Sequence, residues 1–329
     1  MSLLFLGEDL GMGANKLFGA AGGLQTPSYV SVNGGQRVAR ILGLGDAVAP
    51  LQVRTASGAF YIGDGAHDWG RPVENLDYDR LSGSPEMVAL FYGSLTRYIQ
   101  LVGPLAAPLS LTVGLPLEVM TGSEALATVE AVRRWMKGQH SWEADGVCYR
   151  VSVAEVKATT QDVGALFDYL LDQDGQFLPG RREAFAKETG IVSIGFNTLE
   201  LLVVRDRAPV QRFTAGSTSG VRRLLEIVNH NRLYSLGELD ARLRSGQLDV
   251  SAALPVWERE VTGVIERQWG AVWRRFAAVL LVGGGALLLK NTLPLRFAGK
   301  AVIPEEPVMA VARGLYKFSL LRSRQKAKA

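Results

Sequence analysis

The stretch best suited to chemistry is an acidic, glycine-rich turn near the start of the chain. Asp9 is followed by Gly11 and Gly13, then by Lys16, and the apolar residues 3–6 precede it. Because glycine has no Cβ, backbone N–H groups at such a turn can converge on an anion, and Asp9 could hold a hydrated cation. The pattern predicts a strand, a tight turn and a returning strand. An ordinary hairpin whose glycines only make the bend is the alternative.

Three further glycine-rich or polar junctions follow. Residues 191–204 repeat the arrangement of strand, glycine turn and strand about 185 residues later, with Gly195 at the turn. The apolar run 277–282 predicts a strand buried on both faces, and Gly283 to Ala286 after it predicts a short helix. Gln161 stands where a strand passes into a helix. The chain has no GxxxxGK[ST] loop.

Strands and helices must position these turns. The spacing of apolar residues and turn residues predicts strands at 27–32, 109–116 and 302–304 and hairpins at 51–63 and 142–156. It predicts helices at 84–99, 123–136, 161–171, 221–232, 235–244, 252–273 and 306–321. Residues 64–81 are expected to form a polar, irregular surface loop, and residues 33–35 a turn.

Composition indicates a folded protein of two domains or one large one. The 329 residues are 47% hydrophobic and 21% charged. A net charge of only +4 makes direct nucleic-acid binding over a broad surface unexpected. The basic residues near the C-terminus predict a solvated tail, and contact with DNA, an anionic membrane or an acidic partner is the alternative; they are Arg313, Lys317, Arg322, Arg324, Lys326 and Lys328.

The numbers of cysteine and histidine residues bear on disulfides, on zinc sites and on the location of the protein. Cys148 is the one cysteine, which excludes an internal disulfide and fits a reducing, cytoplasmic location. Three dispersed histidines argue against a zinc site. No signal peptide is evident, and the longest apolar run, 276–289, is shorter than the ~20 residues of a membrane span.

Together, the two glycine hairpins, the Gly-Gly-Gly turn and the Gln junction resemble the actin-like ATPases, most closely the prokaryotic ParM/StbA-type filament proteins. The likeness covers nearly the whole chain in order. That family's first hairpin reads D-x-G-x-x-x-x-K, which residues 9–16 match in full. Its second reads D-I-G-x-x-T-x-D, matched by Ile194, Gly195 and Thr198. Residues 282–286 resemble the adenosine motif, and Gln161 resembles the water-orienting Gln or Glu.

The resemblance implies an α/β, two-domain actin-like fold in which duplicated ribonuclease-H-like domains flank a nucleotide cleft. Domain I would span 1–160, with the C-terminal helix, 304–329, packing back on it. Domain II would span 161–303 and include a helical subdomain at about 216–275. These domain boundaries follow from the family's organisation and are not marked by a linker in the sequence.

The resemblance also implies a site for ATP, or GTP, with Mg²⁺. Asp9 and Gln161 would be catalytic, and Asp9 would also be the metal ligand. Lys16 could contact a phosphate or point into solvent, and Gln161 could be an ordinary helix start. Arg222, Arg223 and Glu226 could flank the base or form surface salt bridges. The implied nucleotide-binding residues are Gly11, Met12, Gly13, Ala14, Asn15, Lys16, Gly195, Phe196, Asn197, Thr198, Gly216, Gly283, Gly284, Gly285 and Ala286.

Two positions depart from the family pattern. Ser193 stands where the second hairpin has its first Asp, and Glu200 stands where it has the later one. A serine hydroxyl carries no charge to balance a magnesium ion. Slow hydrolysis or an altered magnesium geometry, with retained nucleotide binding, is therefore expected.

The function implied is that of a cytoplasmic, ATP-binding protein that polymerises head-to-tail and segregates plasmid DNA or positions cargo through a DNA-binding adaptor. A small-molecule kinase of the same wider fold is an alternative, with Asp64, Asp68 and Asp77 as candidate catalytic residues. A non-hydrolysing structural relative is another, supported by Ser193.

Overall fold

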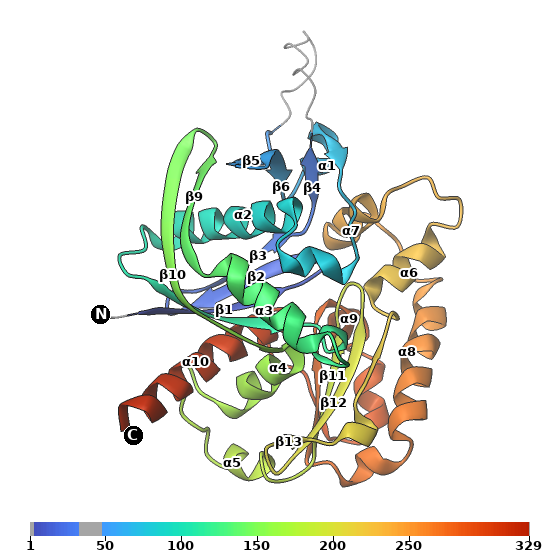
Figure 1. Ribbon diagram of the computed structural model, residues 1–329. Coiled ribbons are helices and arrows are strands. Elements are labelled where there is room, and N and C mark those ends of the chain that lie inside the picture. Colours follow the sequence, from blue (N-terminus) through green and yellow to red (C-terminus); the bar gives the residue numbers. More distant parts are fainter. Residues whose placement is uncertain (1–2, 33–47, 329) are drawn as a thin grey trace.

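A computed structural model of the protein describes residues 3–32 and 48–328. The strands form two sheets, one built from residues before 161 and the other from residues after 188. Figure 1 shows the first sheet in the upper part of the molecule and the second in the lower part. In these described ranges no helix is both long and apolar enough to cross a membrane.

The first sheet has ten strands in the described residues. They are β1 (Leu4–Leu10), β2 (Ala14–Gly19), β3 (Gly22–Pro27), β4 (Val30–Val32), β5 (Leu51–Thr55), β6 (Gly58–Ile62), β7 (Arg71–Pro72), β8 (Leu109–Leu115), β9 (Gly138–Ala144) and β10 (Val147–Thr160). Their order is β3-β2-β1-β8-β10-β9-β5-β6-β4-β7. β1 pairs antiparallel with β2 and parallel with β8, so the glycine turn after β1 lies at one edge of the parallel core.

The second sheet repeats this arrangement with fewer strands. They are β11 (Thr189–Ile194), β12 (Leu199–Arg205), β13 (Ala208–Pro209), β14 (Ala215–Ser217), β15 (Ala278–Val282) and β16 (Ala301–Val302). β11 pairs antiparallel with β12 and parallel with β15. All five residues of β15 are buried, as the sequence predicts for a strand covered on both faces.

Helices cover both sheets. They are α1 (Ala66–Trp69), α2 (Pro85–Val102), α3 (Ala125–Met136), α4 (Gln161–Leu170), α5 (Arg181–Ala184), α6 (Val221–Val228), α7 (Leu236–Arg244), α8 (Leu254–Trp269), α9 (Gly284–Leu288) and α10 (Ala310–Lys328). Short 3-10 helices are η1 (Tyr78–Ser82), η2 (Glu118–Met120), η3 (Gln211–Phe213), η4 (Val272–Arg275) and η5 (Leu293–Phe297). α2 begins where the sequence predicts, because the Ser84 hydroxyl accepts a hydrogen bond from the Met87 amide.

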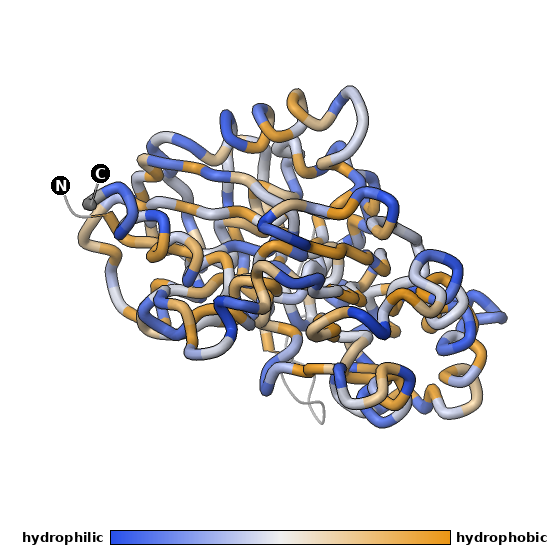
Figure 2. The backbone as a smooth tube through the Cα atoms, turned by 90° about the horizontal axis from the view of Figure 1, so that it is seen from below, coloured by the Kyte–Doolittle hydropathy of each residue, from blue (hydrophilic) through white to orange (hydrophobic). Residues whose placement is uncertain are grey.

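Three apolar clusters hold the layers together. One lies between the first sheet and α2 and α3. A second lies between the second sheet and α6, α8 and α9, and a third joins the other face of that sheet to α4 and α10. Figure 2 shows hydrophobic and hydrophilic residues alternating along the outer helices, as expected of elements that bury one face.

Three expectations from the sequence need correction. Residues 64–81 form α1, β7 and part of η1 instead of an irregular loop, and Leu81 is fully buried with its carbonyl bonded to the Trp135 indole. The strand expected at 27–32 is two strands, since β3 ends at Pro27 and β4 begins at Val30. The C-terminal basic residues belong to α10, where Lys317 is buried. The turn expected at 33–35 lies outside the described residues.

Candidate functional site

A cleft of about 560 Å³ lies between the two sheets, and both glycine hairpins line it. Asp9 and Lys16 come from the first hairpin, and Thr198 comes from the second. Gln161, the first residue of α4, and Gly283, which follows β15, complete the floor. The carboxyl ends of parallel strands therefore meet at one crevice, which is the usual place for a ligand in an open α/β sheet.

The tips of the two hairpins touch. A Cβ added to Gly13 would lie 2.6 Å from the Cβ of Phe196, so only glycine permits this approach. No described residue accepts a hydrogen bond from the backbone N–H groups of Met12, Gly13, Phe196 or Asn197. Four unpaired amides thus lie on two facing turns, an arrangement that suits an anion.

Asp9 is the centre of a compact polar cluster. Its side chain is nearly buried, and its two carboxylate oxygens accept from the Lys16 ammonium at 2.7 Å and from the Gln161 amide at 2.6 Å. The Lys16 side chain is only 13% exposed, so it faces the cleft instead of solvent. The cluster places a cation, an amide and a carboxylate beside the unpaired N–H groups.

The residues present fit a magnesium ion that is held mainly by a phosphate ligand. The described residues contain no cluster of three or more His, Cys, Asp or Glu side chains that could hold a metal alone. Mg²⁺ at phosphate sites is usually bound by one or two carboxylates, water and phosphate oxygens. Asp9, with the Gln161 carboxamide beside it, supplies that type of protein ligand.

Ser193 lies opposite Glu200 in the β11–β12 ladder, beside a pair of buried acids. Glu200 accepts from the Leu117 amide at 3.0 Å and the Thr198 hydroxyl at 3.3 Å, and burial raises its pKa well above the usual value. Asp162 is fully buried, no residue that the structure describes donates a hydrogen bond to its two carboxylate oxygens, and burial raises its pKa to about 7. An uncharged serine at 193 therefore avoids adding a third acid to this cluster.

A set of contacts closes the top of the cleft. The Tyr29 hydroxyl donates to Asp240 at 2.8 Å, and Arg244 donates to the same carboxylate at 2.8 Å. Arg244 also reaches the Gly13 carbonyl at 3.5 Å, and the Gly237 amide donates to Glu74 at 3.0 Å. We call these residues, Tyr29, Glu74, Gly237, Asp240 and Arg244, the upper latch. It joins α7 to the first sheet.

Most residues expected from the sequence line the cleft, and four do not. Asn15 points to the other face of β2, where it bonds to Glu8 at 3.1 Å and Ser94 at 3.0 Å. Gly216 lies in the edge strand β14, and Gly285 and Ala286 pack into the core. The expected residues that do line it are Asp9, Gly11, Met12, Gly13, Ala14, Lys16, Gln161, Gly195, Phe196, Asn197, Thr198, Gly283 and Gly284.

Sequence reasoning missed the wall opposite the hairpins. Arg222, Arg223 and Glu226 do not line the cleft, and Arg223 instead pairs with Glu260 at 2.8 Å. The missed residues are brought in from distant segments, and no local motif marks them. They are Gln25, Pro27, Tyr78, Pro116, Val221, Asp240, Leu243, Arg244, Leu287, Leu288, Val308 and Val311, and Asp64, a candidate only for the kinase alternative, lines the cleft with them.

Comparisons with known proteins agree with this geometry. Residues 7–164 match the family model described as actin like proteins N terminal domain. The structure of apo pSK41 ParM superposes with a TM-score of 0.74 at 14% identity, over 99% of this chain and 100% of that chain. A search of the curated protein sequences finds no match.

Two further solved structures share the fold. A 15-stranded ParM filament from Clostridium botulinum gives a TM-score of 0.72 at 18% identity, over 97% of this chain and 99% of that one. Ta0583, an archaeal actin homologue in complex with ADP, gives 0.71 at 19% identity, over 97% and 100%. The α/β two-domain fold that the resemblance implies is thereby confirmed. Residues 7–164 therefore match the actin-like N-terminal domain family, and the chain as a whole has the fold of these ParM and actin-homologue structures.

Proposed function

We propose that this protein binds ATP with Mg²⁺ in the cleft, hydrolyses it slowly, and polymerises head-to-tail to move plasmid DNA or position other cargo. The observation that carries this proposal is the convergence of the two glycine hairpins, with four unpaired amides, on one crevice. Preorganised backbone donors stabilise phosphate charge without reorganisation, which is the main requirement of phosphoryl transfer.

The residues divide between binding and positioning. The turns at 11–14 and 195–198 would bind the phosphates, and Lys16 would add a charged contact. Asp9 would hold the magnesium ion, which when bound neutralises phosphate charge. Gln161, held against Asp9, would orient the attacking water. Gly283 and Gly284 would let backbone approach the ribose, with Leu287 and Leu288 beside the base.

Assembly would follow from closure of the cleft. In this proposal residues 1–160 and 161–303 form the two lobes, and nucleotide draws them together because it contacts both hairpins at once. The ParM structure from Clostridium botulinum is a filament, which supports the same expectation here. A DNA-binding adaptor would connect the polymer to its cargo.

Light scattering and electron microscopy test the proposal. The purified chain is expected to form filaments with ATP and Mg²⁺ and to lose them when EDTA removes the metal. Asp9→Asn with Lys16→Gln should abolish both nucleotide binding and assembly, whereas Arg133→Gln on the exposed face of α3 should change neither. Nucleotide binding without any polymer would contradict the assembly part. Phosphate transfer that requires a small-molecule acceptor would favour the kinase.

A further inference from the structure

One cation of the cleft comes from α7. Arg244 is the last residue of this helix, which Figure 1 shows next to the first sheet although its residues come late in the chain. Among the described residues that line the cleft, Arg244 and Lys16 are basic, and three aspartates, Asp9, Asp64 and Asp240, are acidic. A magnesium triphosphate is itself an anion, so a lining with a surplus of acid binds it only if its cations reach the phosphates.

The fold holds the Arg244 guanidinium in place. Its Nε donates to Asp240 at 2.8 Å, and the Asp240 side chain, which is 4% exposed, also accepts from the Tyr29 hydroxyl at 2.8 Å. The helix is closely packed as well, because a Cβ on Gly237 would overlap the ring of His67. The guanidinium is therefore oriented before any ligand enters, and a preorganised cation stabilises phosphate charge without reorganisation.

The outer edge of this guanidinium is available to a ligand. Its two terminal nitrogens reach Oε1 of Gln25 at 3.4 Å and the carbonyl oxygen of Gly13 at 3.5 Å, which are long distances for N–H···O hydrogen bonds. The Arg244 side chain also keeps 33% of its surface exposed. Such weak contacts exchange readily for phosphate oxygens, with which a guanidinium forms short, bidentate, charge-assisted hydrogen bonds.

The neighbour of this outer edge is the tip of the first glycine hairpin. Gly13 belongs to the turn whose unpaired amides suit an anion, and it packs against Phe196 of the second hairpin. No hydrogen bond of Arg244 involves residues 283–288, where the proposed function places the adenosine, and the structure describes all of these residues. The guanidinium therefore lies at the end of the cleft that suits phosphate, away from the end that suits the base.

We propose that Arg244 binds the phosphate chain of the nucleotide, as a second phosphate-binding cation in addition to Lys16. This role rests on the proposed function, and it assigns a residue that neither glycine hairpin contains. On binding, Arg244 keeps the bond from its Nε to Asp240 and exchanges its two long contacts for phosphate oxygens. The phosphate chain thereby connects the first hairpin to α7, which belongs to the other lobe.

The nucleotide affinities of Arg244→Gln test this contact. Competition against a fluorescent ADP analogue gives the dissociation constants of ATP, ADP and adenosine for the full-length chain. Arg244→Gln should weaken ATP and ADP at least about tenfold, because a hydrogen bond to a charged group is lost, and should leave adenosine within about twofold of the wild type. Arg244→Lys should recover part of the loss, because an ammonium keeps the charge without the planar fork. Should Arg244→Gln not fold, Arg244→Lys is expected to weaken the phosphorylated ligands alone.

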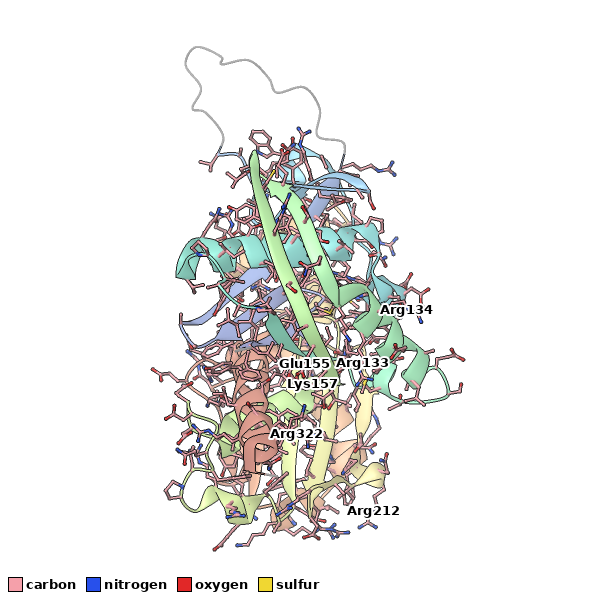
Figure 3. The ribbon with its side chains drawn as sticks, turned by 60° about the vertical axis from the view of Figure 1, so that its left-hand side comes forward. Arg133, Arg134, Glu155, Lys157, Arg212 and Arg322 are labelled. Atoms are coloured by element: carbon pink, nitrogen blue, oxygen red, sulfur yellow. The ribbon has the colours of Figure 1, made fainter. Side chains whose placement is uncertain are left out.

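Two control variants make the same change in charge. Arg242 is on the same helix, but its guanidinium lies over the ring of Tyr234 and does not line the cleft. Arg212 lies at the lower end of the molecule, where Figure 3 labels it. Neither Arg242→Gln nor Arg212→Gln should change the three affinities. The loss caused by Arg244→Gln should also persist in an Asp240→Asn background, where the ion pair between these two residues is already absent.

The outcomes separate the role of Arg244 from the proposed function. If the wild type binds ATP and Arg244→Gln, folded by circular dichroism, binds it equally well, the phosphate contact is wrong and the nucleotide site stands. An equal loss for adenosine and ATP would also overturn the contact, since Arg244 would then act only through the upper latch. A wild type that binds neither ATP nor ADP overturns both.

Discussion

Asp9 collects contacts from residues far apart in the chain. Lys16 lies seven positions away across a hairpin, whereas Gln161 lies 152 positions away at the start of α4. Both donate to a carboxylate that is almost buried, so the charge is compensated without a ligand. In the proposed function, Lys16 turns to a phosphate and Gln161 to the attacking water. The hairpin that the sequence predicts places Asp9 and Lys16 on facing strands, whereas the position of Gln161 depends on the whole first sheet.

Ser193→Asp tests whether the missing carboxylate limits turnover. Alone, the aspartate should lower stability, because it adds a charge beside the buried Glu200 and Asp162. Combined with Glu200→Gln it should raise the rate of phosphate release about tenfold over Glu200→Gln alone. Steady-state phosphate release and urea unfolding measure the two effects. Ser193→Asn is the neutral control, and equal rates in the two Glu200→Gln backgrounds would exclude this role.

His140 predicts a pH dependence of folding that is independent of the cleft. Its ring lies between the Tyr92 hydroxyl at 3.1 Å and the Met136 carbonyl at 2.9 Å, and burial lowers its pKa below 6.5. The unfolded chain therefore binds a proton more readily than the folded one, so stability falls as pH drops below 6.5. His140→Gln should reduce this slope by up to about 1.4 kcal/mol per pH unit. Urea titrations between pH 5 and pH 8 measure it, and parallel curves would contradict the assignment.

At the scale of elements, α4 and α10 form the joint beneath the cleft. Gly164 and Gly314 let the helices approach so closely that a Cβ on Gly314 would lie 1.8 Å from the Gly164 carbonyl oxygen. Asp168 on α4 accepts from Arg313 and Lys317 on α10. Two of the residues that the sequence suggested for a solvated tail therefore fix one helix against another. Amphipathic periodicity predicts both helices, but it does not predict that α4 and α10 pack against each other.

Asp168→Asn is expected to destabilise the joint strongly. Arg313 and Lys317 have side chains only 11% and 7% exposed, so removal of their shared carboxylate leaves Lys317 nearly buried without an ion pair and Arg313 with Glu306 alone. The free energy of unfolding should fall by about 3 kcal/mol, as found when one partner of a buried ion pair is removed. Urea unfolding measures this loss. Asp174→Asn, an exposed aspartate in the next loop, is the control, and an equal effect of both changes would refute the prediction.

At the scale of the molecule, two lobes face each other across one cleft and are joined at the bottom and the top. The bottom connection is the passage from β10 into α4, with Glu200 bonded across it to the Leu117 amide. The top connection is the upper latch, in which Tyr29 and Asp240 are 211 residues apart in sequence. Because hydrogen bonds make the top connection, whereas the chain itself runs through the bottom one, the top is the part that can open.

Tyr29→Phe with Asp240→Asn should loosen the upper latch. A hydrogen bond to a charged group contributes about 1.5–3 kcal/mol, so nucleotide should dissociate roughly tenfold faster. Stopped-flow release of a fluorescent ATP analogue measures the rate, and small-angle scattering should show a larger radius of gyration in the absence of nucleotide. Asp249→Asn, exposed beyond α7, is the control. Unchanged release with an unchanged radius would show that the latch does not hold the lobes.

The sequence by itself determined the two glycine hairpins, the buried strand β15, the start of α2 and the order of the motifs. These features depend on local chemistry: periodicity of apolar residues, helix caps and the need for glycine at tight turns. Only the tertiary structure decided that Asn15 turns away from the cleft, that Asp240 and Arg244 enter it, and that Lys317 is buried. Those outcomes depend on which face of an element meets a distant partner, and packing between segments remote in sequence sets that choice.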